Sequence, residues 1–262
     1  MSSLFAPMAR RLGAATFVAL LAACSSTPKD ETAGMSVERV YSEARDDAAA
    51  GNYERAIRFY ERLEGRAAGT LLAQQAMLEL AHTYYRSGER AQALATIERY
   101  MKLYPTSAAS DYALYLKGLI NFNDNLGLFG RFSGQSLSDR DQQASKEAYQ
   151  SFRQLVDLYP DSVYAPDAQA RMNFIVNSLA QYEVGVARYY FRRGAYVAAA
   201  NRAQLAVQEY QQSPAVEEAL HLMVRSYDRL GLPELRDDAL RILRLNFPQS
   251  TFLSQAETTS VR

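Results

Sequence analysis

The sequence predicts an all-α solenoid of about five helix hairpins. Glycines recur at a fixed interval, because Gly51 and Gly88 are 37 residues apart and so are Gly194 and Gly231. A period of about 20 to 50 residues is typical of a repeat array. An aromatic residue follows three of these glycines by 16 positions, at Tyr104, Tyr210 and Phe247. Apolar residues keep helical spacing and no strand pattern occurs, so each unit is expected to be a helix, a turn at the glycine and a second helix.

The first residues have the pattern of a processing segment. Arg10 and Arg11 precede a 12-residue apolar run from Leu12 to Ala23. Because about 20 apolar residues are needed to cross a bilayer, this run predicts the core of a signal peptide over residues 1–23. The sequence Leu21-Ala22-Ala23-Cys24 resembles the bacterial lipobox, in which the cysteine receives a diacylglycerol and an N-acyl chain.

Cys24 is the only cysteine of the chain and stands at the predicted cleavage edge. A lone thiol makes neither an internal disulfide nor a metal cluster, so lipidation is its expected role; the alternative is an ordinary secretory signal with an incidental cysteine. Several acyl chains on one residue would give stable anchoring. By resemblance to lipoproteins, Ser25 at the next position favours sorting to the outer membrane. Residues 24–35 are polar and are predicted to form a flexible tether.

The repeat domain is expected to occupy residues 36–250. Its first hairpin spans about residues 37–69 with a turn at Gly51, and its second spans about residues 71–107. The second hairpin resembles the tetratricopeptide pattern at Leu80, Ala81, Tyr84, Gly88, Ala93, Ile97 and Pro105. Small residues there let two helices cross closely, and large residues fill the space between crossings. The chain is therefore predicted to be a right-handed solenoid of tetratricopeptide-like hairpins.

An insertion interrupts the third hairpin. Its first helix is predicted at residues 112–122, and Ala148, Phe152, Leu155 and Tyr159-Pro160 mark its second helix. Residues 123–141 lie between the two helices. Loops of this length are uncommon in compact domains and are functional or disordered. Phe129 and Phe132 favour a loop that packs or binds, and disorder is the alternative.

One long helix follows and opens the fourth hairpin. Pro166 suits the first position of a helix, and the pattern continues to Arg193 with Gly185 as a weak breaker. The fifth hairpin is expected to begin with Ser213 as its N-cap. Residues 251–262 lack periodicity and are predicted to be a mobile tail.

The sequence gives no sign of catalysis or of a cofactor. Basic and acidic side chains balance at 29 against 29, which gives no support to a nucleic-acid partner. His82 and His221 lie in different hairpins without a cluster of ligands, so no metal site is predicted. No catalytic or nucleotide-binding motif occurs, and the chain is therefore expected not to be an enzyme.

A basic cluster surrounds the turn at Gly194. It consists of Arg188, Arg192, Arg193 and Arg202, with Tyr196 among other aromatic residues. Arginine and tyrosine are enriched at binding hot spots, so the cluster is a candidate partner surface. Ordinary solvated surface is the alternative.

Several stretches together resemble the BamD family, the lipoprotein subunits of the outer-membrane β-barrel assembly (BAM) machine. Beside the lipobox and the tether, they are residues 111–119, 138–141 and 158–162, and above all the run Tyr-Tyr-Phe-Arg-Arg-Gly-Ala-Tyr-Val-Ala at residues 189–198. The resemblance spans Cys24 to about Pro248. One departure lies at residues 64–70, where the family often has a Tyr-Pro-Phe-Gly-like stretch and this chain reads Glu-Gly-Arg-Ala-Ala-Gly-Thr.

This resemblance implies a scaffold that is lipid-anchored to the periplasmic side of the cell outer membrane. The C-terminal hairpins would dock the barrel-forming subunit BamA, with Arg202 at that contact, and other BAM lipoproteins would bind along the same body. The N-terminal hairpins would receive the C-termini of unfolded outer-membrane proteins. By analogy with tetratricopeptide grooves, the residues that line this substrate-peptide groove are expected to be Tyr41, Arg45, Gln75, His82, Tyr85 and Arg86. The alternative function is a tetratricopeptide lipoprotein that serves as an adaptor for enzymes of cell-wall synthesis or hydrolysis.

Overall fold

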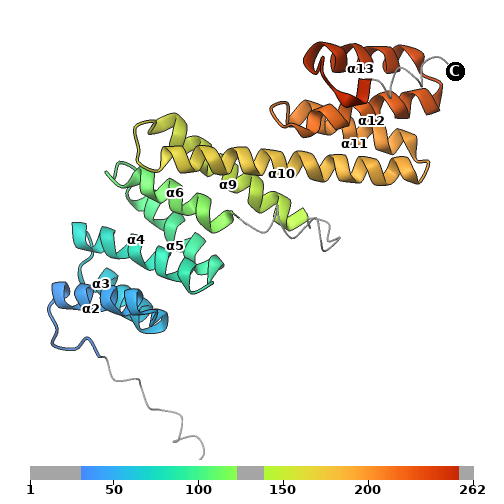
Figure 1. Ribbon diagram of the computed structural model, residues 1–262. Helices are drawn as coiled ribbons and strands as arrows, with labels where there is room; N and C mark the ends of the chain where they lie inside the picture. The colour runs from blue at the N-terminus through green and yellow to red at the C-terminus, as the bar shows by residue number, and fades with distance from the viewer. Residues whose placement is uncertain (1–30, 123–138, 254–262) are drawn as a thin grey trace, which may run out of the picture.

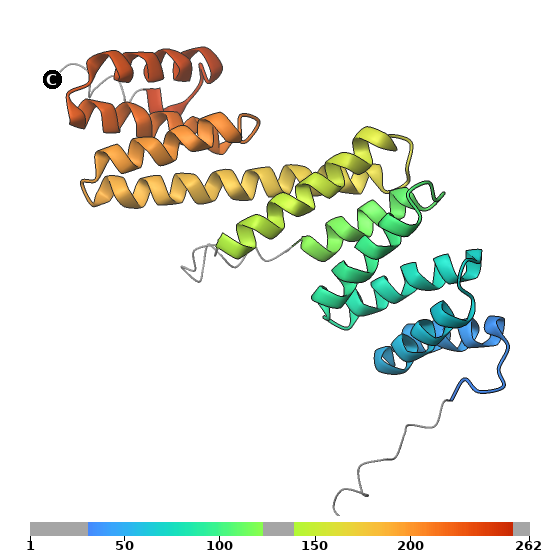
Figure 2. The same ribbon diagram turned by 180° about the vertical axis from the view of Figure 1, so that it is seen from behind.

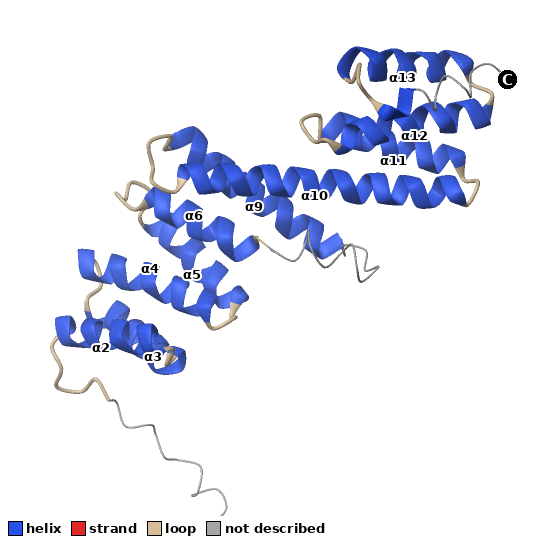
Figure 3. Ribbon diagram, in the orientation of Figure 1, coloured by secondary structure: helices blue, strands red, loops and turns tan. Residues whose placement is uncertain are grey.

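The structure, a computed structural model, describes residues 31–122 and 139–253, and these residues form helices and no strand. The helices of the N-terminal half are α2 (Val37–Ala50), α3 (Tyr53–Arg66), α4 (Leu71–Arg86), α5 (Arg90–Leu103), α6 (Ser110–Asn121) and α9 (Asp139–Leu158). Those of the C-terminal half are α10 (Ala165–Arg192), α11 (Tyr196–Glu209), α12 (Ala215–Leu230) and α13 (Pro233–Asn246). The expectation of an all-α chain is confirmed for this part of the sequence (Figure 3).

Each helix packs mainly on its neighbours in sequence, which makes the molecule a helical repeat solenoid. The pairs are α2 with α3, α4 with α5, α6 with α9, the later half of α10 with α11, and α12 with α13. Figures 1 and 2 show that these pairs follow one another along the molecule in the order of the sequence, from the N-terminal pair to the C-terminal pair. The 28-residue helix α10 belongs to both halves, because it contacts α9 near its start and α11 and α12 near its end.

The repeated glycines and aromatic residues mark the ends of helices. Gly51, Gly88, Gly194 and Gly231 all have positive φ, from 69° to 85°, which is the left-handed backbone that a residue without Cβ adopts most easily. Tyr104, Tyr210 and Phe247 occupy the C-cap positions of α5, α11 and α13. The glycine therefore marks the turn inside a hairpin, and the aromatic residue marks the end of its second helix.

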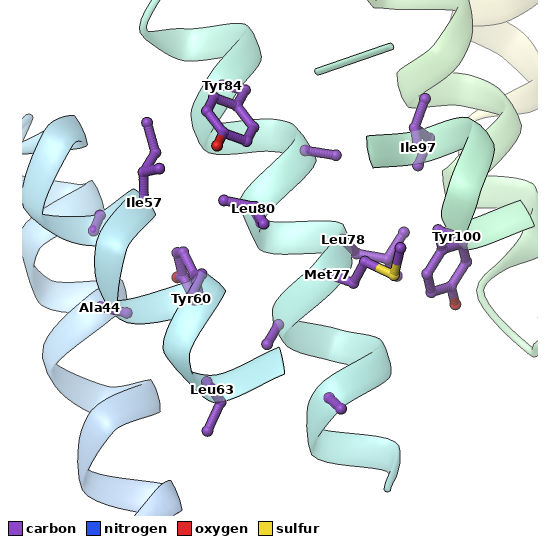
Figure 4. Packing of buried hydrophobic residues seen from close by; sticks show 14 of the residues in the cluster. Ala44, Ile57, Tyr60, Leu63, Met77, Leu78, Leu80, Tyr84, Ile97 and Tyr100 are labelled. Atoms are coloured by element: carbon purple, nitrogen blue, oxygen red, sulfur yellow. The ribbon is translucent and has the colours of Figure 1, made fainter. Parts of the chain in front are cut away.

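The core is a series of apolar clusters that follow one another along the stack. The first cluster joins α2 to α6, and Figure 4 shows Tyr60, Leu63, Met77 and Leu80 within it. The next cluster joins α6, α9 and the start of α10, and another joins the end of α10 to α11 and α12. Alanines with no exposed surface stand where helices cross, at Ala44, Ala56, Ala81, Ala93, Ala148, Ala199 and Ala219. Small residues at these points let the helix axes approach closely.

The structure corrects the predicted tether in its last residues. Thr32 is only 2% exposed, and Arg66 donates to the carbonyl oxygens of Thr32 and Met35 at 3.1 and 2.6 Å. Glu31 accepts from Arg55 Nε at 2.9 Å. Residues 31–35 are therefore held against α3, whereas residues 24–30 lie outside the described part of the chain. Composition missed this contact because it depends on arginines about 30 positions away.

The predicted mobile tail also begins later than expected. Residues 251–253 form a helical turn, in which Phe252 stacks on His221 with ring centroids 4.6 Å apart and Leu253 packs against the last apolar clusters. Residues 254–262 lie outside the described residues. Two aromatic rings can stack across elements without leaving any periodic signal in the sequence, which is why the contact was not predicted.

Two predicted boundaries shift by a few residues. Helix α9 begins at Asp139, so the insertion ends before residue 139, and its residues 123–138 lie outside the described part. Pro214, not Ser213, is the N-cap residue of α12, although Ser213 Oγ accepts a bond from the backbone N–H of Ala215 at 3.2 Å. The long helix after Pro166 is confirmed as α10.

Candidate functional site

Two of the pockets on the N-terminal half lie at opposite ends of one face of α4. The larger is an open cavity of about 940 Å³ between α4, the α5–α6 loop and the loop before α10. We call it the tyrosine pocket, after Tyr100, Tyr104, Tyr112 and Tyr164 in its lining. Leu71 and Val163, also in the lining, are 82% and 83% exposed. Exposed aliphatic side chains beside aromatic rings give this cavity an apolar wall open to solvent.

The tyrosines of this pocket are fixed by contacts with one another and with loop residues. The rings of Tyr100 and Tyr104 lie 5.3 Å apart, and those of Tyr112 and Tyr164 lie 5.4 Å apart. The hydroxyls of Tyr100 and Ser107 are 2.7 Å apart and share a hydrogen bond. Burial raises the pKa of Tyr112 far above its ordinary value, so its hydroxyl stays protonated. The pocket thus offers preformed rings and hydroxyl groups, with the carboxylates of Glu79 and Asp111 also in its lining.

The smaller pocket, of about 220 Å³, lies at the C-terminal end of α4. We call it the arginine pocket. Its lining residues are Arg45, Ala48 and Ala49 of α2, Tyr53 and Tyr60 of α3, and Glu79, His82, Thr83 and Arg86 of α4. The guanidinium of Arg45 lies 5.9 Å from the ring centre of Tyr41, and that of Arg86 lies 5.9 Å from the ring centre of Tyr53.

The ionisable groups of the arginine pocket leave a net positive charge. Burial lowers the pKa of His82, and nearby Arg86 lowers it further while Glu79 opposes the shift, so the imidazole is neutral at pH 7. Burial also raises the pKa of Tyr60, which keeps its hydroxyl protonated. With two arginines against one carboxylate, the pocket favours an anionic group.

The structure brings some of the predicted groove residues together and separates others. Arg45, His82 and Arg86 line the arginine pocket, and Gln75 lines the tyrosine pocket. Tyr41 packs edge-on against Tyr60, with ring centroids 6.2 Å apart, and lines neither of these two pockets. Tyr85 likewise lines neither, and its ring lies 6.4 Å from that of His82. Peptide binding by these residues stays a prediction.

Sequence reasoning missed Tyr60 and Glu79 as lining residues. Tyr60 reads as an ordinary core position of α3, and its side chain is indeed fully buried. Glu79 carries a signal that could have been used, because residues 75, 79, 82 and 86 have the spacing of one helix face. Its side chain lines both pockets, which connects them along α4.

Two of the four arginines in the basic cluster near Gly194 form ion pairs with glutamates. Arg188 binds Glu218 of α12 at 2.6 Å, and Arg202 binds Glu183 of α10 at 3.0 Å. The Glu183 side chain is only 5% exposed, so Arg202 neutralises a buried carboxylate and is not a freely available surface charge. Sequence reasoning grouped all the arginines alike because the two pairings are 30 and 19 residues apart in the chain.

The remaining arginines of the cluster face solvent. Arg192 and Arg193 are exposed, and the guanidinium of Arg193 lies 5.6 Å from the ring centre of Tyr189, itself 48% exposed. Tyr196 is half-buried, with its ring 5.3 Å from that of Phe191. The exposed part of this surface therefore consists of two cations beside an aromatic ring, which is a common composition of protein contacts.

Other kinds of site find no support in the described residues. They contain no group of three histidine, cysteine, aspartate or glutamate side chains arranged to hold a metal ion. Among the helices of this part, none has both the length and the apolar character that crossing a membrane requires. Cys24 lies outside the described residues.

Comparison with known proteins places the chain in a family. The family model described as "YfiO: Outer membrane lipoprotein" matches residues 33–243. Outer membrane protein assembly factor BamD of Neisseria meningitidis serogroup A (strain Z2491) is 46% identical over 86% of this chain and 84% of that protein. The BamD proteins of Xylella fastidiosa (strain Temecula1) and Vibrio cholerae (strain El Tor Inaba N16961) are 36% and 34% identical, over 91% and 87% of this chain and 82% and 95% of theirs. The chain therefore belongs to the YfiO family of outer membrane lipoproteins and, with these relatives, to the BamD family.

Proposed function

We propose that the chain is a scaffold for the assembly of β-barrel proteins into the outer membrane, and that it acts by binding and not by catalysing a reaction. The observation that carries this proposal is the similarity to outer membrane protein assembly factors over 82% to 95% of their length. A relative that is similar over nearly its whole length shares the stacked hairpins and the surfaces between them. Lipidation of Cys24 would confine the scaffold to the periplasmic face of the outer membrane and raise the local concentration of its partners.

The two candidate surfaces would serve different partners. The pockets along α4 lie in the N-terminal half, and the exposed arginines lie at the far end of α10, which separates the two surfaces along the stack (Figure 1). The C-terminus of an unfolded barrel protein would enter the pockets along α4. BamA would dock near Arg192 and Arg193. One molecule would then hold a substrate and the barrel-forming subunit at once.

The geometry decides which arginines suit a test of docking. Arg202→Glu would place a second carboxylate beside the buried Glu183, so loss of binding by that variant could reflect local unfolding. Arg192 and Arg193 have no ion pair within the described residues and can be reversed in charge without leaving a buried carboxylate unpaired.

We expect the double variant Arg192→Glu/Arg193→Glu to lose co-purification of BamA by about tenfold or more, because both cations lie in the proposed contact. The measurement is quantitative pull-down from detergent-solubilised envelopes, with circular dichroism as the check on folding. Arg62→Glu is the matched control, since Arg62 is an exposed arginine on α3 at the other end of the molecule.

Crosslinking in intact envelopes tests the function itself. A photoreactive residue at position 192 should capture BamA. Capture of peptidoglycan synthases or hydrolases instead would support the adaptor function and contradict the assembly scaffold.

A further inference from the structure

Four arginines follow one face of α3, in the hairpin at the N-terminal end of the stack (Figure 1). Arg55, Arg58, Arg62 and Arg66 are spaced by three, four and four residues, which is the spacing of neighbours on one side of a helix. Arg55 is half-buried, and the other three are exposed. We call these four residues the α3 row.

Two glutamates of the same helix are directed toward the next hairpin instead. Glu61 accepts a hydrogen bond from the hydroxyl of Tyr84 of α4 at 2.7 Å, and Glu64 pairs with Arg99 of α5. Glu54, in the first turn of α3, is exposed. Along most of its length α3 therefore has its cations and its carboxylates on different sides.

Acidic side chains from outside α3 neutralise only the start of the α3 row. Arg55 binds Asp47 at 2.7 Å and Glu31 at 2.9 Å, and Arg58 lies 3.7 Å from the same Glu31. No ion pair of Arg62 occurs among the described residues. The charge at the later positions of the row is thus available to an anion.

The segment that leads back toward Cys24 lies along this row. Its Glu31 contacts the two arginines near the start of α3, and Arg66 near the end of α3 donates to the carbonyl oxygens of Thr32 and Met35. Carbonyl oxygens carry no net charge, so these bonds hold the segment in place without neutralising Arg66. The chain therefore reaches the folded body beside the α3 row.

The length of chain between this contact and Cys24 limits how far the α3 row can lie from a lipid anchor. Glu31 is seven positions after Cys24, and an extended chain spans at most about 3.6 Å per residue, so the two residues are at most about 25 Å apart. Acyl chains on Cys24 would fix that residue at the bilayer surface. A tether of this length lets the row reach the lipid headgroups and raises their effective concentration around it.

We propose that the α3 row docks on the anionic phospholipid headgroups of the bilayer that anchors Cys24, and so lays α3 against the membrane. Arg62 and Arg66 donate to phosphate oxygens, for which the planar guanidinium group has a matching geometry. Arg58 adds a third exposed cation, whose side chain is 55% exposed. This inference rests on the proposed lipidation of Cys24 and deepens it, because it specifies which face of the protein turns toward the membrane.

The test measures how close α3 lies to the headgroups. Gly65→Cys gives a labelling site in the last turn of α3, where an added Cβ would meet no neighbouring group within 4 Å. Gln208→Cys, exposed in the last turn of α11, is the matched site away from the row. Since acylation blocks the thiol of Cys24, a fluorophore attaches only to the introduced cysteine. The mature full-length protein is reconstituted in vesicles that contain a lipid with a spin-labelled headgroup, which quenches fluorophores near the bilayer surface.

Quenching at position 65 should depend on the charge of the vesicle. We expect it to be at least about threefold stronger with phosphatidylethanolamine and phosphatidylglycerol in equal parts than with phosphatidylethanolamine and phosphatidylcholine, because arginines near an anionic surface each strengthen attachment. Sodium chloride at about 1 M should remove most of this difference, because the Debye length then falls to about 3 Å. Quenching at position 208 should stay low in both kinds of vesicle.

Two variants with the same loss of charge separate the α3 row from the net charge of the protein. Arg58→Gln/Arg62→Gln should lower quenching at position 65 in the anionic vesicles to the level of the neutral ones. It removes two exposed cations and leaves Glu31 paired with Arg55. Arg192→Gln/Arg193→Gln, at the far end of α10, should leave the quenching unchanged.

Three results would overturn the inference: equal quenching in anionic and neutral vesicles, quenching at position 65 no stronger than at position 208, or full quenching in Arg58→Gln/Arg62→Gln. The second result would leave the α3 row to a protein partner. Each of them contradicts membrane docking alone, whereas a protein that does not float with the vesicles would contradict the proposed lipid anchor as well. Capture of BamA at position 192 is a separate measurement. Arg62→Glu stays a control for co-purification of BamA, because detergent replaces the bilayer there.

Discussion

His221 is buried in the last hairpin although its side chain titrates near neutral pH in water. Its exposed fraction is 4%, its Nδ1 atom has no hydrogen-bond partner among the described residues, and Phe252 stacks on its ring. Burial lowers its pKa to about 4; the charge of Arg225 adds to this effect and that of Glu218 opposes it. The fold therefore holds the imidazole in its neutral form.

This burial predicts that stability falls in mild acid. In the unfolded chain His221 takes up a proton below about pH 6.5, whereas in the folded protein it does so only near pH 4. The unfolded state thus binds more protons between these values, and the free energy of unfolding should fall by up to about 3 kcal/mol as pH drops from 6.5 to 4. Above pH 6.5 this residue should contribute no pH dependence. Urea denaturation at a series of pH values measures the effect.

The control for this prediction is His221→Phe. It should flatten the dependence between pH 6.5 and 4 while keeping a ring against Phe252. Part of the slope should remain, because the pKa of His82 is also lowered by burial. If the free energy of unfolding of the variant depended on pH as steeply as that of the unmodified protein, protonation of His221 would not be the cause of the acid destabilisation.

At the scale of the element, α10 joins the two halves of the molecule. Its 28 residues are about 42 Å long at the ordinary helical rise. Its early buried residues belong to the cluster with α6 and α9, and its late ones to the cluster with α11 and α12. Gly185 lies in the later part as a helical residue, and a Cβ added there would meet no other atom within 4 Å.

We expect Gly185→Ala to stabilise the protein by about 0.5 to 1 kcal/mol. Alanine has the higher helix propensity and lowers the conformational freedom of the unfolded chain, and the space for its methyl group is open. Chemical denaturation at neutral pH gives the change in the free energy of unfolding.

Gly118 supplies the matched control, because it is another glycine inside a helix but has no such space. A Cβ at Gly118 would come within about 2.4 Å of the Phe152 ring, which has no exposed surface. Gly118→Ala should therefore destabilise the protein by about 1 to 3 kcal/mol through overpacking. If both substitutions changed stability in the same direction, packing against Phe152 would not be what requires glycine at position 118.

At the scale of the whole molecule, the apolar clusters lie in series and each helix contacts mainly its sequence neighbours. In such an array stability is close to a sum of local terms, so the two ends can open independently. An array built in this way can open at one end and keep the other end intact.

This arrangement predicts that damage to one end stays local. Leu80→Ala removes a side chain that is 2% exposed in the first cluster and should cost about 2 to 5 kcal/mol there. Hydrogen exchange should then speed up in α2 to α5 and stay unchanged in α12 and α13. Leu222→Ala, at a 4% exposed position of the cluster around α12, is the reciprocal control. Faster exchange at both ends in either variant would show that the solenoid unfolds as one unit.

The sequence by itself determined the hairpins, their turns and their ends. A glycine in the left-handed region and an aromatic C-cap are local requirements, and the helical spacing of apolar residues is local as well, so the chain reports them directly. The docking of residues 31–35 and 251–253 was missed, because its partners are far away in sequence.

Only the tertiary structure decided which of the candidate residues carry an available charge. Arg202 and Arg188 look like Arg192 in the sequence, but each is paired with a glutamate from another helix. Tyr60 has the pattern of a core residue, and its unpartnered hydroxyl becomes evident only when α2, α3 and α4 are packed together. Electrostatic and hydrogen-bond partners are set by distances across helices, and a one-dimensional pattern does not contain those distances.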